Sequence, residues 1–257
     1  MTLSIDNLQQ MEIEYIKMFS EVSEDEQTLT FNNSNIPDMY THNFDLYKSD
    51  VGLLEYIESQ INKVETKAKG FFRIETYHPI SADLIEKLSV KPQICTYDFM
   101  GIETRNYINL IGNPECSVLS AESSRVLEDG ITVDIAVNEE GMGLDFATRR
   151  IKGKAEVYKN PDKAIELFVC YSGDTPIGNI EYIPFNRVAK FEDFDILEDY
   201  QRRSFGTSVL KHLLEKAFDN NIEHAYLITD QADTAKEMYK KNGFEKVGEK
   251  TELLFLF

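Results

Sequence analysis

The chain has 257 residues, of which 42% are hydrophobic, and it carries a formal net charge of -18. The apolar content excludes a wholly disordered chain, and so acidic a surface repels phosphate backbones, so we expect no nucleic acid partner. The chain shows neither the basic and apolar regions of a secretion signal nor an apolar run near the roughly 20 residues of a membrane helix, so we expect a cytoplasmic protein without membrane contact.

The first half of the chain predicts helices and strands in alternation. Apolar spacing indicates helices at residues 8–19, 51–67 and 81–88, the last of them capped by Ser81. Short apolar and aromatic runs predict strands at residues 28–31, 71–77 and 93–102, with a loop over the rest of 20–38. The turn sequence Gly112-Asn113-Pro114 marks a boundary, so we expect domains at residues 1–115 and 116–257.

The second half begins with a predicted strand at 131–137 and a helix at 144–158. A hairpin of strands 165–171 and 177–183 follows, then a strand at 189–197. A long helix opens at residues 201–206, and its apolar stripe comprises Val209, Leu210, Leu213, Leu214, Ala217 and Phe218. A strand at 225–228, a helix at 234–242 ended by Gly243, and a strand at 253–257 complete an α/β fold with a mixed sheet.

Cysteines and histidines give no sign of a metal site. The three cysteines, Cys95, Cys116 and Cys170, lie far apart in the sequence, and their odd number favours a reducing compartment without a disulfide framework. The histidines also lack metal-ligand spacing. We therefore expect free thiols and no metal.

The junction between Leu197 and Val209 carries the clearest chemical signal. A strand ends there and a helix begins, so unpaired N–H groups and partial positive charge lie together. Arg202 and Arg203 add charge, and Gly206 permits close approach of a ligand. These features suit a phosphate or pyrophosphate, although an ordinary helix start with solvent-facing arginines is equally open on this pattern alone.

Residues 196–207 resemble the acetyl-coenzyme A signature of the GNAT N-acetyltransferase superfamily, Gln/Arg-x-x-Gly-x-Gly/Ala. Here the signature reads Gln201-x-x-Ser204-x-Gly206, with serine in place of the first glycine. Residues 235–244 resemble the family's Ala-x-x-x-Tyr-x-x-x-Gly-Phe ending. The family's asparagine seven residues before the tyrosine is replaced by Ala232. The resemblance covers roughly residues 120–257 and implies the GNAT acyl-CoA N-acyltransferase fold there.

The resemblance implies acetyl-CoA as co-substrate and direct acetyl transfer to a primary amine of a small molecule or peptide. It implies that backbone groups of Ile196 and Leu197 pair with the pantetheine arm. The pyrophosphate would be held by Gln201, Arg202, Arg203, Ser204, Phe205, Gly206 and Thr207. The acidic surface would attract cationic amines; the alternative is that it only aids solubility.

Tyr239 matches the family's general acid, which protonates the departing thiolate; the alternative is that it only packs against the coenzyme. The general base is open among a water molecule and four carboxylates, Glu181, Glu192, Asp193 and Asp195. Strand alternation would place Asp193 and Asp195 on one face and Glu192 on the other. The chain has no Gly-x-Ser-x-Gly elbow or phosphate loop.

The strand, helix and strand at residues 71–102 resemble the closing part of a GNAT fold. A degenerate GNAT-like N-terminal domain would give a tandem arrangement similar to some bacterial acetyltransferases, and an unrelated α/β cap is the alternative. The cluster at residues 38–44 could line a pocket or form a packed loop. Two rival functions are an acyl-CoA-binding sensor without catalysis and a pure interaction protein, and the resemblance allows a homodimer.

Overall fold

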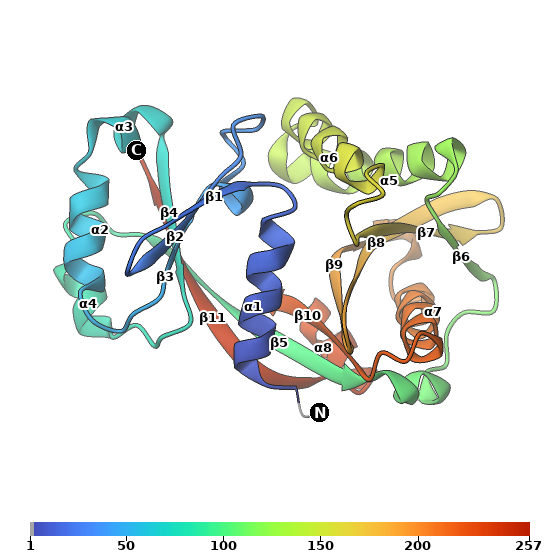
Figure 1. Ribbon diagram of the computed structural model, residues 1–257. Helices are drawn as coiled ribbons and strands as arrows, with labels where there is room; N and C mark the ends of the chain where they lie inside the picture. The colour runs from blue at the N-terminus through green and yellow to red at the C-terminus, as the bar shows by residue number, and fades with distance from the viewer. Residues whose placement is uncertain (1–2) are drawn as a thin grey trace. The chain divides into compact units, whose positions relative to one another are not determined.

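The computed structural model describes residues 3–257, except for the side chains of residues 64 and 65 (Figure 1). The chain forms two compact units. Unit 1 comprises Met100–Ile228 and Thr234–Val247 together with the first residues up to Met11, and unit 2 comprises Glu12–Phe99, Thr229–Asp233 and Gly248–Phe257. Both units are therefore discontinuous in sequence. We keep the division at residues 1–115 and 116–257 as a proposal about sequence domains.

Unit 1 is built on strands in the order β10-β9-β8-β7-β6. These strands are β6 (Cys116–Ser120), β7 (Glu166–Ser172), β8 (Thr175–Phe185), β9 (Val188–Ile196) and β10 (His224–Asp230). Neighbours from β6 to β9 pair antiparallel, whereas β9 and β10 pair in parallel. The predicted hairpin is thus confirmed as β7 and β8, and its tight turn uses Gly173 in a left-handed conformation.

Helices cover both faces of the sheet in unit 1 (Figure 1). The helices α5 (Ser124–Met142) and α6 (Leu144–Tyr158) pack together, and α5 also contacts β7, β8 and β9. On the opposite face lies α7 (Phe205–Asp219), whose buried residues are Phe205, Val209, Leu210, Leu213, Leu214 and Ala217. The predicted apolar stripe is confirmed except for Phe218, which is 46% exposed. The short helix α8 (Ala235–Lys241) precedes Gly243, which has the left-handed conformation of a helix end.

Unit 2 has strands in the order β1-β2-β3-β4-β11. They are β1 (Glu21–Glu24), β2 (Thr28–Asn32), β3 (Asp45–Tyr47), β4 (Phe71–Thr76) and β11 (Glu245–Leu256). The helices are α1 (Ile5–Ile16), α2 (Leu53–Ile61), α3 (Val64–Lys69) and α4 (Ala82–Lys87). Four unit boundaries fall within α1, β10, β11 and β5 (Gln93–Glu103), and the fifth lies between Asp233 and Thr234, just before α8. An aromatic and aliphatic core that includes Tyr47, Ile57 and Phe255 holds unit 2 together.

The predicted strand at residues 131–137 is wrong, because this segment lies inside α5. Its β-branched residues favour a strand locally, but Ser123 caps a helix by accepting a hydrogen bond from the Val126 N–H. Leu127, Gly130 and Val133 then repeat at helical spacing and are buried. A Cβ atom on Gly130 would lie 2.8 Å from Leu167, so this glycine allows α5 to lie close against β7.

Smaller differences concern short elements. The helix predicted over 51–67 is divided into α2 and α3, and the final strand begins earlier than predicted, at Glu245. The strands β1, β3 and β6 were not predicted. Residues 38–44 form the packed loop of the two alternatives, since the buried Asn43 side chain donates to the carbonyls of Ile36 and Met39 at 3.0 and 2.8 Å. In the described part of the chain, no helix is long and apolar enough to cross a membrane.

Candidate functional site

The pairing between strands β9 and β10 ends partway along β9, within unit 1. Their parallel pairing runs from Val188 and His224 to Phe191 and Leu227 and then ends, although β9 continues to Ile196. On its other side β9 stays paired with β8 as far as Ile196 opposite Gly178. The last residues of β9 therefore have a partner strand on one edge only. Backbone groups on the other edge are placed to bind a ligand in an extended conformation.

A bulge interrupts β9 just before this open edge. Glu192 pairs with Glu181 and Asp195 pairs with Asn179, so Asp193 and Phe194 together stand opposite one residue of β8. Asp193 has a φ of 45°, a left-handed conformation that is uncommon for a residue other than glycine.

The bulge corrects the prediction from strict alternation. Glu192 lies directly opposite Glu181, so both side chains share one face of the sheet. Asp193 is on that face too, because it contacts the same Lys154 as Glu181 does. Glu192 and Asp193 therefore do not lie on opposite faces, since the extra residue resets the alternation.

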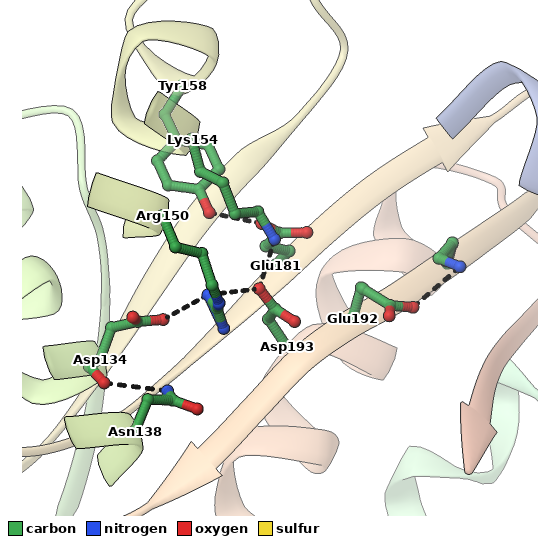
Figure 2. A network of polar contacts seen from close by, with 9 residues as sticks. Asp134, Asn138, Arg150, Lys154, Tyr158, Glu181, Glu192 and Asp193 are labelled. Atoms are coloured by element: carbon green, nitrogen blue, oxygen red, sulfur yellow. Dashed lines mark hydrogen bonds and ion pairs between the residues drawn. The ribbon is translucent and has the colours of Figure 1, made fainter. Parts of the chain in front are cut away.

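A buried network of charges connects α5 and α6 to this part of the sheet (Figure 2). Arg150 Nη1 lies 3.2 Å from Asp134 Oδ2 and 3.3 Å from Asp193 Oδ2. Lys154 Nζ lies 2.6 Å from Glu181 Oε1 and also binds Asp193. Burial alone would lower the pKa of Lys154, but Asp193 and Glu181 reverse this and raise it.

Asp195 differs from the other three candidate bases. Glu181 and Asp193 bind the cations of α6, and Glu192 lies 2.8 Å from Lys190 Nζ. Asp195 has no ion pair in the described part of the chain, and burial together with the charges of Asp193 and Asp134 raises its pKa to about 6. A carboxyl group that titrates there can exchange protons near neutral pH.

The predicted phosphate turn lies directly after β9. Arg202 and Ser204 both have left-handed backbones, with φ of 57° and 63°. The Gln201 side chain donates to the Ile196 carbonyl at 2.9 Å, which closes the turn onto the strand end. The Arg203 guanidinium lies 5.4 Å from the ring centres of Tyr200 and Phe205, so it is held by cation–π contacts. The structure thus brings all these predicted residues together.

The start of α7 offers hydrogen-bond donors. The first bond along the helix runs from the Ser208 N–H to the Ser204 carbonyl at 3.1 Å. The N–H groups of Phe205, Gly206 and Thr207 precede it and so have no acceptor within the helix. Ser204 begins the helix without a side-chain cap, so no side chain of that residue binds these donors, which lie together at the positive end of the helix dipole. This arrangement suits a phosphate group.

Two glycines near the turn have structural reasons that the sequence did not reveal. A Cβ atom on Gly206 would lie 2.9 Å from Met238 Sδ, so this glycine allows α8 to approach α7. A Cβ atom on Gly112 would overlap Ser208. Beside Gly112, the Asn113 side chain donates to the Arg203 carbonyl at 2.9 Å, and its N–H donates to Ser208 Oγ at 2.7 Å. The predicted boundary turn therefore also braces the phosphate turn.

The remaining predicted residues occupy distinct places. Tyr239 is 7% exposed on α8 and packs edge to face against Phe244, with ring centres 5.9 Å apart. Its neighbour Met238 is the residue nearest Gly206, so Tyr239 lies on the helix that packs against the turn.

The Leu197 N–H donates to the Ile177 carbonyl at 2.8 Å and the Leu197 carbonyl accepts from Tyr200. The Ile196 N–H points the opposite way, toward the open edge of β9.

Comparison with known proteins gives matches to acetyltransferases. Residues 138–244 match the model of the acetyltransferase (GNAT) family. The chain is 26% identical over 246 residues to a Bacillus subtilis (strain 168) protein named "Uncharacterized N-acetyltransferase CgeE". This match covers 91% of the chain and 92% of the relative.

Solved structures share the fold over most of the chain. A functionally unknown conserved protein from Staphylococcus epidermidis ATCC 12228 has a TM-score of 0.78 at 22% identity, covering 95% of this chain and 98% of its own. A GCN5-related N-acetyltransferase from Kribbella flavida has a TM-score of 0.70 at 11% identity, covering 98% of this chain and 96% of its own. A tandem GNAT protein from the clavulanic acid biosynthesis pathway has a TM-score of 0.56 at 7% identity, covering 82% of this chain and 75% of its own. The predicted mixed α/β fold of the GNAT type is therefore confirmed.

Proposed function

We propose that this GNAT-family acetyltransferase moves an acetyl group from acetyl-CoA directly to a primary amine of a small molecule or peptide. The observation that carries the proposal is the open edge of β9, which leads within a few residues into the uncapped start of α7. An extended, amide-containing arm suits the first, and a pyrophosphate suits the second. Coenzyme A contains both groups in that order.

The donor would be held by backbone groups more than by side chains. We propose that the N–H groups of Phe205, Gly206 and Thr207 bind the pyrophosphate, with Arg202 and Arg203 adding positive charge. Because both backbone groups of Leu197 are bonded within the chain, the Ile196 N–H is the better donor to the pantetheine arm or to the thioester oxygen. A backbone donor at that oxygen would stabilise the negative charge that develops during transfer.

We propose that Asp195 accepts the proton of the incoming ammonium group, directly or through water. The amine nitrogen then attacks the thioester carbon, an amide C–N bond forms, the C–S bond breaks, and the nitrogen releases its second proton to solvent. The raised pKa of Asp195, about 6, leaves the carboxylate largely deprotonated at neutral pH while keeping it basic. The four acids near Arg150 and Lys154 would also favour a cationic acceptor.

We propose that Tyr239 donates the proton that the departing thiolate receives. Its place on α8, against the helix that begins at the phosphate turn, supports this role. Tyr239→Phe keeps the ring that packs on Phe244 and removes only the hydroxyl. Turnover should fall about 100-fold or more, with the Kd of acetyl-CoA unchanged. Unchanged turnover would leave Tyr239 a packing residue.

The function is tested by binding and turnover in one set of measurements. Acetyl-CoA at 100 times its Kd should raise the free energy of unfolding by about 2.7 kcal/mol. Acetate, the control, should not raise it. Release of free thiol is then followed across a panel of primary amines. Binding with turnover supports the transferase, binding without turnover for any amine would indicate an acyl-CoA sensor, and absence of binding would refute both.

A further inference from the structure

The backbone of Asp193 occupies a conformation that its surroundings must hold in place. Its φ of 45° lies in the interior of β9, where a left-handed residue other than glycine is uncommon. Aspartate tolerates this conformation better than most residues, but nothing in the local sequence demands it. Strain of this kind persists where tertiary contacts determine the conformation.

Two cations of α6 bind the Asp193 carboxylate. Lys154 binds Oδ2, and Arg150 Nη1 lies 3.3 Å from the same oxygen (Figure 2). Both cations are buried, with side-chain exposures of 3% for Lys154 and 9% for Arg150. We call Arg150, Lys154 and Asp193 the clamp. Buried cations need paired anions, so the clamp opposes any movement of Asp193 away from α6.

Each cation is also fixed on its far side. Arg150 reaches Asp134 of α5 at 3.2 Å, and Lys154 reaches Glu181 of β8 at 2.6 Å. Tyr158 donates a further hydrogen bond to Glu181. Glu181 pairs with Glu192, the residue immediately before Asp193. The clamp is therefore anchored to α5 and β8, on both sides of the bulge.

The bulge determines what the end of β9 presents. A single extra residue shifts the pairing of residues 194–196 against β8, and a shift by one residue exchanges the faces of every side chain that follows. With the bulge, Asp195 lies opposite Asn179 beside Asp134, and the Ile196 N–H faces the open edge. Without it, both groups would change sides.

We propose that Asp193 is a positioning residue, and that the clamp from α6 fixes the β9 bulge so that the Ile196 N–H and the Asp195 carboxylate meet the acyl donor and the amine. This inference rests on the proposed acetyl transfer. It assigns to α6 a role in the reaction although its clamp residues contact neither substrate. Since the phosphate turn is a separate backbone element, loss of the clamp should affect the chemical step more than acetyl-CoA binding.

Three substitutions of Asp193 separate charge from backbone conformation. Asp193→Asn keeps the shape, tolerates the left-handed backbone and still accepts hydrogen bonds from Arg150 and Lys154. Asp193→Gly permits the left-handed backbone but removes the carboxylate that Arg150 and Lys154 bind. Asp193→Ala removes the carboxylate and also disfavours the left-handed backbone. We expect kcat to fall about 10- to 100-fold for the alanine variant, with a smaller loss for glycine and most activity retained for asparagine. KM for acetyl-CoA should change less than about three-fold in all of them.

Asn186→Ala is the matched control. Asn186 has a φ of 49° in the turn between β8 and β9, so its replacement introduces the same backbone strain without touching the clamp. It should lower stability and leave kcat unchanged per folded molecule. Equal kcat for wild type and Asp193→Ala, measured on folded protein, would overturn the inference while leaving acetyl transfer intact.

A binding measurement covers the case in which the alanine variant folds poorly or no amine is found. The backbone amide resonance of Ile196 should shift when acetyl-CoA binds to the wild type and to Asp193→Asn. It should shift less in Asp193→Gly. The same shift in all three proteins would overturn the clamp's role, and absence of acetyl-CoA binding by the wild type would overturn the clamp and the proposed function together.

Discussion

Each unit contains a buried ionic network on its sheet, yet the two networks differ in the backbone beneath them. In unit 2, Arg73 binds Glu75 and lies 2.7 Å from Glu252, and Lys250 lies 3.0 Å from Glu75. These residues stand on the regular ladder of β4 and β11, which pairs without interruption from Thr76 opposite Thr251 to Phe71 opposite Leu256. In unit 1 the network holds a bulge beside an open strand edge.

Left-handed residues show the same contrast. In the described part of unit 2 they are glycines, Gly52 and Gly70. Unit 1 also places other residues in this conformation. Asp193 is one of them and lies within β9, and Arg202 and Ser204 lie between the end of β9 and the start of α7. Backbone strain concentrates at functional sites because binding and catalysis constrain the backbone there. A buried ion pair alone therefore does not mark a site, and we propose that one which supports a strained backbone beside an open strand edge does.

The largest effect is expected for the titratable carboxylate of unit 1. Asp195→Asn keeps the size of the side chain and removes the proton acceptor, so kcat should fall about 100- to 10,000-fold. In the wild type, kcat/KM should rise with pH through about 6. Steady-state kinetics across pH measure both effects. Glu192→Gln is the control, and a larger loss for this variant would transfer the role of base to Glu192.

Stability gives a second readout of the same group. The pKa of Asp195 is raised in the folded state from 3.8 to about 6, so the folded chain binds more protons than the unfolded chain between these values. Stability should therefore fall as pH rises through this window. Asp195→Asn should flatten that part of the stability curve, as measured by urea unfolding from pH 4 to pH 7.

The next largest effect concerns the network of unit 2. Arg73→Met leaves Glu75 and Glu252 without their shared cation, so the free energy of unfolding should fall by about 3–5 kcal/mol. The Kd of acetyl-CoA, measured on the folded fraction, should not change. Denaturant unfolding and calorimetric titration test the two statements. A large loss of acetyl-CoA affinity would contradict the claim that the network of unit 2 contributes to stability alone.

The smallest effect is expected in the phosphate turn. Ser204→Gly should stabilise the chain by about 0.5–1 kcal/mol, because relief of the left-handed conformation exceeds the added flexibility of glycine in the unfolded chain. Ser204→Ala should give no such gain, since alanine has the same Cβ. Thermal unfolding of the two variants provides the comparison. Stabilisation by alanine as well would attribute the gain to loss of the hydroxyl.

The sequence by itself determined those features whose signals lie close together in the chain. Helical spacing gave α7 its buried face, and the pattern of Gln201, Ser204 and Gly206 marked the turn before it. The left-handed φ of Ser204 explains why glycine is the usual residue there. These elements could be predicted because capping, turn chemistry and amphipathic spacing depend on neighbours within a few residues.

Only the tertiary structure decided where the charged side chains act. Asp193 and Asp195 look alike in sequence, but a bulge and two cations some forty residues earlier in the chain make one an anchored carboxylate and leave the other to titrate near pH 6. The misassigned strand at residues 131–137 has a different origin, because the Ser123 cap and the helical spacing of Leu127, Gly130 and Val133 are local signals. Only the fit of Gly130 against β7 depends on a distant segment. Burial and ionic partners come from distant segments, and local sequence carries no record of them.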